Sequence, residues 1–234
     1  MGFAMHENIS LVQPVTGSTD CIYFLSGDLE AEAEILEFGQ DDKGHFIVCD
    51  CTVFHAQGGG QKSDRGMIDG VEILSVTKRG TPQEFSVMHY LSAPLVKSAG
   101  DKITMQVNGE TRALHSRLHS LGHLLAHVVD EAYPVLKAVQ GHHWPDECRV
   151  EFAIANDASV APDETHINDL LARAIAADLP VLSCFSPDQN RTVQIGMYEP
   201  VPCGGTHVAT TRELVSGITR GIKIKGDRVR ISYE

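Results

Sequence analysis

The chain has 234 residues, of which 42% are hydrophobic and 21% are charged, and its formal net charge is −12 with histidines counted as neutral. This composition is that of an ordinary globular protein, and it excludes disordered, collagen-like and low-complexity chains. The length allows one large domain or two modest domains, and either can bury a core without disulfide bonds. The acidic balance argues against a nucleic-acid partner unless the basic groups gather on one face.

The opening residues 1–14 lack a basic region followed by a long apolar run, and no later window approaches 18 uncharged apolar residues. The six cysteines are scattered without the spacing of a disulfide scaffold. This usage fits a reducing compartment and leaves thiols free for metal binding. We therefore expect a soluble, unsecreted, cytoplasmic protein with no membrane association.

Short strands dominate the predicted structure of the first hundred residues. Alternating polar and apolar residues predict a strand over 27–36 whose solvated face carries Glu30, Glu32 and Glu34. A second strand is predicted over 45–54. Further short strands are expected at 67–68, 71–74, 85–88 and 102–107. Many short strands separated by turn residues indicate a small barrel or sandwich.

Helical spacing appears in the second half of the chain. The apolar residues between 111 and 129 predict a helix that Pro134 limits. Its inward stripe is expected to be Leu114, Leu118, Leu121, Leu125 and Val128. A second helix is predicted across 165–177. Strands are also expected in this half of the chain, at 149–154, 193–195 and 221–225. The expected class is α+β, with an N-terminal β-barrel domain over 1–108 and an α+β domain over 109–234.

Four histidines recur at every fourth position of the first predicted helix: His115, His119, His123 and His127. Residues four apart lie about 6 Å apart along one helix face, so two such imidazoles can bind one metal ion. The spacing does not identify which pair would be the ligands. An exposed or hydrogen-bonded helix face is the alternative interpretation of any single pair.

A partner for such a pair is available in Cys203-Gly-Gly-Thr-His207. A thiolate and an imidazole joined by a flexible Gly-Gly turn can surround one ion, and a mixed Cys and His set points to zinc. A competing set lies in the predicted strand at His45, Cys49, Cys51 and His55. That set extends over about 30 Å of strand, so we interpret its members as strand residues.

Two motifs in the second half resemble those of a known family. The segment Arg112–Leu125, with His119-Ser-Leu-Gly-His123, and the later segment Pro202-Cys-Gly-Gly-Thr-His-Val208 are similar to the HxxxH and CGGTHV motifs of the alanyl-tRNA synthetase editing domain. The match is closer still to the free-standing relatives of that domain, the AlaX proteins.

The resemblance extends over nearly the whole chain. The segment Thr52–Gln61, followed by Asp64 and Gly66, is similar to the glycine-rich motif of the larger AlaX members. The ending 223–233 also resembles the close of the family. Three motifs in the family's order make the match specific.

The resemblance implies a zinc site, with zinc as the cofactor. It also implies which two of the four helix histidines are metal ligands. The implied metal ligands are His119, His123, Cys203 and His207, and the implied catalytic residues, which act through this metal site, are His119 and His123. It further implies that the glycine-rich loop leans over this site, that Thr52 recognises the amino-acid hydroxyl and that Gln61 lies near the substrate. The implied substrate-binding residues are therefore Thr52, Gly58, Gly59, Gly60 and Gln61.

The activity that the resemblance implies is trans-editing by a zinc-dependent aminoacyl-tRNA deacylase. Such enzymes hydrolyse the ester that joins a wrong amino acid, serine or glycine, to alanine tRNA. A synthetase pocket built for alanine rejects glycine or an added hydroxyl poorly, so a second, hydrolytic site is needed. Mischarged alanine tRNA is the expected partner, and no obligate protein partner is implied. No aminoacylation core precedes the barrel, and the chain ends at Glu234 without the extension of longer relatives, so we expect editing without charging.

The chain departs from the family's pattern at two places. The HxxxH motif reads His-Ser-Leu-Gly-His where the family usually has Thr-Ala after the first histidine, and its Gly122 should loosen the helix slightly. At the second place, His55-Ala56-Gln57 replaces the usual Tyr-Pro-Glu. Neither departure removes a metal ligand, but the second bears on the choice between serine and glycine. Four protein ligands also describe a closed zinc site. The ion therefore expands its coordination, holds one ligand loosely, or positions the substrate while another group activates water.

Two other readings of the motifs stay open. One is a zinc hydrolase that acts on small esters or amides, and the other is a non-catalytic tRNA-binding module with a structural zinc. The loop Thr52–Gln61 favours the editor, because a structural zinc does not need a glycine-rich cover that carries a hydroxyl.

The net charge is unevenly distributed along the chain. Residues 1–108 carry a net charge of −8, whereas residues 212–234 carry +3. The expected tRNA-binding residues are Arg112, Arg117, Lys223, Lys225, Arg228 and Arg230, with a solvated strand as the alternative. This distribution predicts weak, strongly salt-sensitive tRNA binding.

Overall fold

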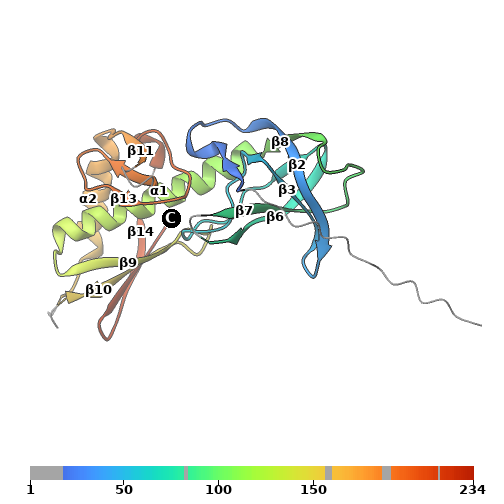
Figure 1. The fold of residues 1–234 in the computed structure, drawn as a ribbon. Coiled ribbons are helices and arrows are strands. Elements are labelled where there is room, and N and C mark those ends of the chain that lie inside the picture. Colours follow the sequence, from blue (N-terminus) through green and yellow to red (C-terminus); the bar gives the residue numbers. More distant parts are fainter. Residues whose placement is uncertain (1–17, 82–83, 156–159, 186–190, 216) are drawn as a thin grey trace, which may run out of the picture. The chain divides into compact units, whose positions relative to one another are not determined.

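The computed structural model describes residues 18–81, 84–155, 160–185, 191–215 and 217–234, so the opening residues 1–14 lie outside the described part. The chain divides into two compact units (Figure 1). The first comprises the residues up to Ala56 together with Ser63–Asn108, and the second comprises Gln57–Lys62 together with Gly109–Glu234. Strands predominate, and two α-helices occur within the described ranges. The expected α+β class is therefore confirmed.

Six strands of the first unit close into a barrel in the order β2-β3-β7-β6-β5-β8. Their bounds are Glu30–Asp41 for β2, Gly44–Cys49 for β3, Gly66–Ile68 for β5, Val71–Gly80 for β6, Phe85–Leu91 for β7 and Lys102–Val107 for β8. Outside the barrel, β1 (Asp20–Cys21) precedes the short 3-10 helix η1 (Ile22–Phe24) and pairs in parallel with β4 (Cys51–Thr52). Glu30, Glu32 and Glu34 are exposed on β2, as the alternating pattern predicted.

The predicted continuous strand over 45–54 is wrong, because the chain bends at Asp50. The Asp50 carboxylate accepts the backbone N–H groups of Glu34 and Cys51, both at 2.8 Å. A short acidic side chain that captures nearby backbone donors competes with strand pairing. Therefore β3 ends at Cys49 and β4 has only two residues.

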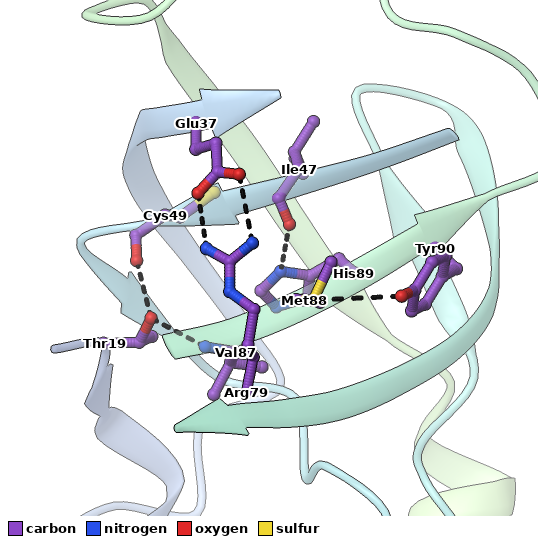
Figure 2. Close-up of polar contacts among 9 residues, drawn as sticks. All are labelled: Thr19, Glu37, Ile47, Cys49, Arg79, Val87, Met88, His89 and Tyr90. Carbon is purple, nitrogen blue, oxygen red and sulfur yellow. Dashed lines mark hydrogen bonds and ion pairs between the residues drawn. The ribbon is translucent and has the colours of Figure 1, made fainter. Parts of the chain in front are cut away.

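Polar groups in the barrel wall are paired (Figure 2). The buried Glu37 carboxylate receives a hydrogen bond from the Arg79 guanidinium at 3.1 Å. The Thr19 hydroxyl donates to the carbonyl of Cys49 and accepts from the N–H of Val87, both at 3.0 Å. A buried carboxylate or hydroxyl without a partner would cost stability, so these contacts let polar side chains occupy the wall.

The second unit packs two helices with two antiparallel sheets. The helices are α1 (Gly109–Ala132) and α2 (Glu164–Ala176). The four-stranded sheet has the order β14-β15-β10-β9, with bounds Thr219–Lys225, Arg228–Tyr233, Arg149–Ile154 and Leu136–His142. The three-stranded sheet has the order β11-β12-β13, with bounds Val181–Phe185, Arg191–Ile195 and Val201–Pro202. The short 3-10 helix η3 spans Thr211–Leu214.

The first predicted helix is confirmed, although its inward stripe is partly wrong. Leu121, Leu125 and Val128 are buried, but Leu114 is 37% exposed. Leu124 and Val129 are both fully buried, so the face that meets the core is centred further round the helix than the predicted stripe.

The second predicted helix is confirmed, and a side chain caps its start. The Asp163 carboxylate accepts the N–H of His166 at 2.7 Å, which satisfies one of the free donors at the helix start. Ile167, Leu171 and Ala174 are buried on its inner face. No helix in the described part of the chain combines the length and apolarity needed to cross a bilayer.

Candidate metal centre

A tight turn at Gly58–Gln61 belongs to the second unit. Gly58 and Gln61 exchange two backbone hydrogen bonds, of 3.2 and 3.0 Å, and the φ angles of Gly59 and Gly60 are +58° and +77°. Two consecutive positive φ values are required at the centre of a type I′ turn and favour glycine. The N–H of His143 donates to the Gly60 carbonyl at 2.9 Å. The glycine run therefore forms a tight turn that is hydrogen-bonded to His143, and the turn and Gln61 both belong to the second unit.

The helix α1 supplies two imidazoles one turn apart. The rings of His119 and His123 are stacked, with centroids 4.9 Å apart and an interplanar angle of 17°. His115 and His127 lie outside the group, and the ring of His127 instead stacks on Tyr198 at 4.7 Å. His119 and His123 are therefore the two of the four helix histidines that lie in a group able to hold a metal ion.

The segment Cys203–His207 supplies a thiol and a third imidazole. The N–H of Gly205 donates to the Cys203 sulfur at 3.4 Å. The Arg191 guanidinium donates to the carbonyls of Cys203 and Gly205, at 3.0 and 2.7 Å. A Cβ at position 205 would collide with the ring of His119, so glycine is required there for close approach. The Gly205 N–H and the Arg191 guanidinium therefore fix the conformation of this turn by hydrogen bonds.

The four side chains form a set with the dimensions of a metal site. Their ligand atoms all lie within 4.8 Å of one another, and within the described ranges this is the one such set of His, Cys, Asp or Glu residues. The Cys203 sulfur lies 3.3, 3.5 and 3.4 Å from the Nε2 atoms of His123, His119 and His207. Tetrahedral zinc with ordinary bond lengths separates a sulfur from a nitrogen ligand by about 3.6 Å. The residues therefore fit zinc, and the competing set at His45, Cys49, Cys51 and His55 forms no such group.

The electrostatics of the site favour a neutral His123. Burial, with a smaller contribution from His127, lowers the pKa of His123 to about 4. Burial also raises the pKa of the Cys203 thiol, although the Gly205 N–H and the Arg191 charge act in the opposite direction. A neutral imidazole offers a lone pair to a metal ion, and a cation between the ligands would favour the thiolate.

Sequence reasoning missed His143, which lies against the metal group. Its ring stacks on His119 with centroids 4.5 Å apart, and its Nδ1 is hydrogen-bonded to the Tyr233 hydroxyl, which donates to the Leu118 carbonyl at 2.9 Å. A Cβ at Gly122 would collide with this imidazole. The available sequence signal for this contact was Gly122, because a glycine in a helix can make room for a side chain from a distant segment.

Thr52 lies in the first unit, where it is fully buried. Its hydroxyl is 2.8 Å from Nε2 of His89 and accepts the N–H of Phe54 at 3.0 Å. Nδ1 of His89 is 3.3 Å from the Ile47 carbonyl, which can only accept, so Nδ1 carries the hydrogen (Figure 2). Thr52 therefore donates to Nε2 of His89, and burial lowers the pKa of His89 to about 4 and keeps it neutral. The remaining capacity of the Thr52 oxygen is that of an acceptor.

The predicted basic residues of the last two strands gather on one face. In the β14–β15 hairpin, Lys223 is opposite Arg230 and Lys225 is opposite Arg228, and all four are exposed. They line one groove together with Glu151, which pairs with Arg230 at 2.7 Å. Like charges directly opposite each other are unfavourable, so this arrangement suits an anionic partner.

The two other predicted basic residues differ from the hairpin. Arg117 is exposed on α1 and lines a shallow pocket with Leu114 and Glu234. Arg112 is 8% exposed, which leaves little of its guanidinium for a phosphate.

Comparison with known proteins gives consistent relatives. The chain is 31% identical over 188 residues to the alanyl-tRNA editing protein AlaX-M of Pyrococcus horikoshii, which covers 79% of this chain and 82% of that protein. It is 29% identical to the alanyl-tRNA editing protein AlaX-M of Methanosarcina barkeri, over 88% of this chain and 92% of that protein. An alanine–tRNA ligase of Francisella tularensis is 27% identical over 78% of this chain, but only 24% of the ligase is matched. No protein-family model matches the chain.

Proposed function

The chain belongs to the AlaX family of alanyl-tRNA editing hydrolases, and on that premise we propose that it is a zinc-dependent deacylase of mischarged alanine tRNA. Its substrate is the ester between serine and the tRNA, with glycine as a second substrate. The reaction takes place in trans, in the cytoplasm, after the mischarged tRNA has left the synthetase.

The observation that carries this proposal is the convergence of the two family motifs. The HxxxH pair of α1 and the CGGTHV turn are about eighty residues apart in the sequence, yet they place three imidazole nitrogens within 3.5 Å of one sulfur. His119 and Cys203 are buried in this group. The donor set and its dimensions are consistent with zinc, which supports this proposal.

The chain's own residues would hold the ion and shape its surroundings. His119, His123, Cys203 and His207 are the ligands that we propose. When bound, zinc supplies Lewis acidity that polarises an ester carbonyl or a water molecule. The Gly58–Gly60 turn and Gln61 bring a backbone without side-chain bulk to the same unit, which suits a segment that borders an aminoacyl group.

We propose that Thr52 reads the hydroxyl of serine. Because Thr52 donates its own hydrogen to His89, it can receive a hydrogen from a serine hydroxyl but has none to offer. A buried polar group that is satisfied only by the correct ligand gives large discrimination. Glycine lacks this hydroxyl, so its release would not depend on Thr52.

We propose that the four basic residues of the β14–β15 hairpin contact the tRNA. Lys223, Lys225, Arg228 and Arg230 present four cationic groups on one groove. Such groups bind the phosphate backbone without reading its sequence, and they make affinity depend on salt. Arg117 on α1 is a further basic residue on the surface of the same unit.

A structural zinc in a non-catalytic tRNA-binding module is the second candidate. The observation that favours it is the set of four protein donors, which leaves no open position in an ordinary tetrahedral site. The two candidates differ in whether the protein turns over substrate.

The deciding experiment measures deacylation of alanine tRNA charged with serine, glycine or alanine. We expect fast release of serine, slower release of glycine, and alanine largely spared. Equal rates on all three esters, or no release above the uncatalysed rate, would exclude the editing function. Binding without release would favour the structural-zinc module.

A further inference from the structure

The side chain of Gln61 is fully buried and makes contacts with two segments of the metal centre. Its Oε1 accepts the backbone N–H of Thr206 at 3.0 Å and lies 2.7 Å from Nδ1 of His119. Its Nε2 donates to the Thr206 hydroxyl at 2.9 Å. That hydroxyl is in turn 2.7 Å from the hydroxyl of Ser116 on α1. All four residues belong to the second unit.

These contacts determine the tautomer of His119. A backbone N–H can only donate, so the Gln61 atom that faces Thr206 N is the carboxamide oxygen. The same oxygen faces Nδ1 of His119, so Nδ1 carries the hydrogen. The lone pair of the ring therefore lies on Nε2, the atom that faces the Cys203 sulfur at 3.5 Å.

We propose that Gln61 is a positioning residue for the metal ligand His119. It holds the imidazole in the tautomer and ring orientation that present Nε2 to the ion, and it ties the glycine-rich turn to the metal-binding turn through Thr206. A hydrogen-bond acceptor on the second nitrogen of a ligating histidine orients the ring and raises its basicity. This role rests on the proposed metal centre and deepens it, but it does not depend on which ester is hydrolysed.

The placement also explains why the glycines flank this contact. Gly60 lies directly before Gln61 with a positive φ, and a Cβ there would meet the Gly141 carbonyl at 2.5 Å. A Cβ at Gly205 would meet Oε1 of Gln61 at 2.8 Å. Both glycines let two backbone segments approach closely enough for one carboxamide to bridge them.

The test compares three variants of the full-length protein: Gln61→Leu, Gln61→Glu and Gln57→Leu. Zinc affinity is measured by competition with a chelator, and the visible spectrum of the cobalt-substituted protein reports ligand geometry. Gln61→Leu removes the acceptor, so we expect zinc affinity to fall about 10- to 100-fold and the cobalt spectrum to change.

Gln61→Glu keeps an acceptor for both N–H groups, and the Thr206 hydroxyl can reverse to become a donor, so zinc affinity should stay within about threefold of wild type. Gln57 is exposed on the same turn, so Gln57→Leu controls for the substitution itself and should leave zinc affinity unchanged. Unchanged affinity in Gln61→Leu, or an equal loss in Gln61→Glu, would overturn the positioning role.

A measurement on the wild-type protein covers the case in which Gln61→Leu fails to fold. A long-range proton–nitrogen NMR spectrum of the zinc-loaded protein should show His119 protonated at Nδ1, and Nε2-protonated or doubly protonated His119 would contradict the proposal. Absence of serine deacylation by the wild-type protein would reject the editing function and leave these metal readouts intact. The two failures are therefore distinguishable.

Discussion

The first unit buries His89 with both ring nitrogens on protein partners, the Ile47 carbonyl and the Thr52 hydroxyl. In the second unit His119 has one nitrogen on Gln61, while its other nitrogen faces the sulfur of Cys203 together with two more imidazoles. The ligand atoms of these four residues all lie within 4.8 Å of one another. Both ring nitrogens of His89 are therefore hydrogen-bonded within the protein, whereas the second unit gathers ligand atoms that a cation could bind.

This difference separates two uses of the same side chain. In the barrel, a neutral imidazole fixes the direction of one hydroxyl, and the burial that lowers its pKa keeps the arrangement constant near neutral pH. In the second unit, burial lowers the pKa of His123, and the neutral ring keeps a lone pair available for a metal ion. The two units should consequently respond differently to ligand removal, to acid and to changes in substrate.

The largest difference is expected from removing metal ligands. Cys203→Ala and His119→Ala should each lower zinc affinity by more than the roughly 100-fold that a supporting residue can cost, with loss of serine deacylation. Metal content is measured by elemental analysis of the purified variants. Trp144, the one tryptophan of the chain, lies in the second unit, so its fluorescence follows thermal unfolding there.

Matched controls are available for both substitutions. Cys184 is exposed on β11, and His127 lies on the same helix outside the metal group. Cys184→Ala and His127→Ala should keep one equivalent of zinc. If they lose zinc as Cys203→Ala does, the ligand set is wrong.

Acid should destabilise the barrel through His89. Its folded pKa of about 4 lies below the ordinary histidine pKa of 6.5, so the unfolded chain binds the proton more tightly. Stability from this residue is complete above pH 6.5 and is lost as the pH falls towards 4, by about 3 kcal/mol in all. Hydrogen exchange of the β3 and β7 amides reports the stability of the first unit alone. The substitution His89→Gln should reduce the pH dependence of that stability between pH 6.5 and 4. An unchanged dependence would show that other groups control acid stability.

Substrate discrimination should respond to Thr52. Thr52→Val removes an acceptor worth about 1–1.5 kcal/mol, so serine release should fall about tenfold while glycine release changes little. The measurement is single-turnover deacylation of both esters. Thr104→Val, at an exposed position of β8, is the matched control and should alter neither rate. An equal loss on both esters would remove the hydroxyl-reading role.

The smallest effect is expected from the hairpin. Lys225→Ala with Arg228→Ala should weaken tRNA binding several-fold at low salt and reduce the slope of log affinity against log salt by about 2. The double variant Arg173→Ala with Arg212→Ala removes two exposed charges elsewhere in the second unit and should change neither quantity. Equal effects of the two double variants would show that net charge, rather than this groove, governs binding.

Sequence patterns predicted the barrel strands and both helices because their burial follows simple periods. β8 and β10 lie at the predicted residues. The strand break at Asp50 was not predictable from alternation, because it depends on which backbone donors a single carboxylate captures. Leu114 was misplaced because a period alone does not give the centre of a helix's buried face.

The four metal-group residues were identified from motif resemblance, and the spacing of the histidine ladder alone left the pair open. His143, Arg191 and the tautomer set by Gln61 depend on contacts between segments distant in the sequence. Such contacts leave only indirect traces, such as Gly122 beside the ring of His143. These supporting residues therefore required the three-dimensional arrangement.

We expect editing by this chain to depend on a metal held by His119, His123, Cys203 and His207. The most direct test of this dependence removes the metal from the wild-type protein and adds zinc back in steps, with bound zinc and serine deacylation measured on the same samples. We predict that activity rises in proportion to bound zinc and levels off at one equivalent. Full activity in the metal-free protein would contradict the account.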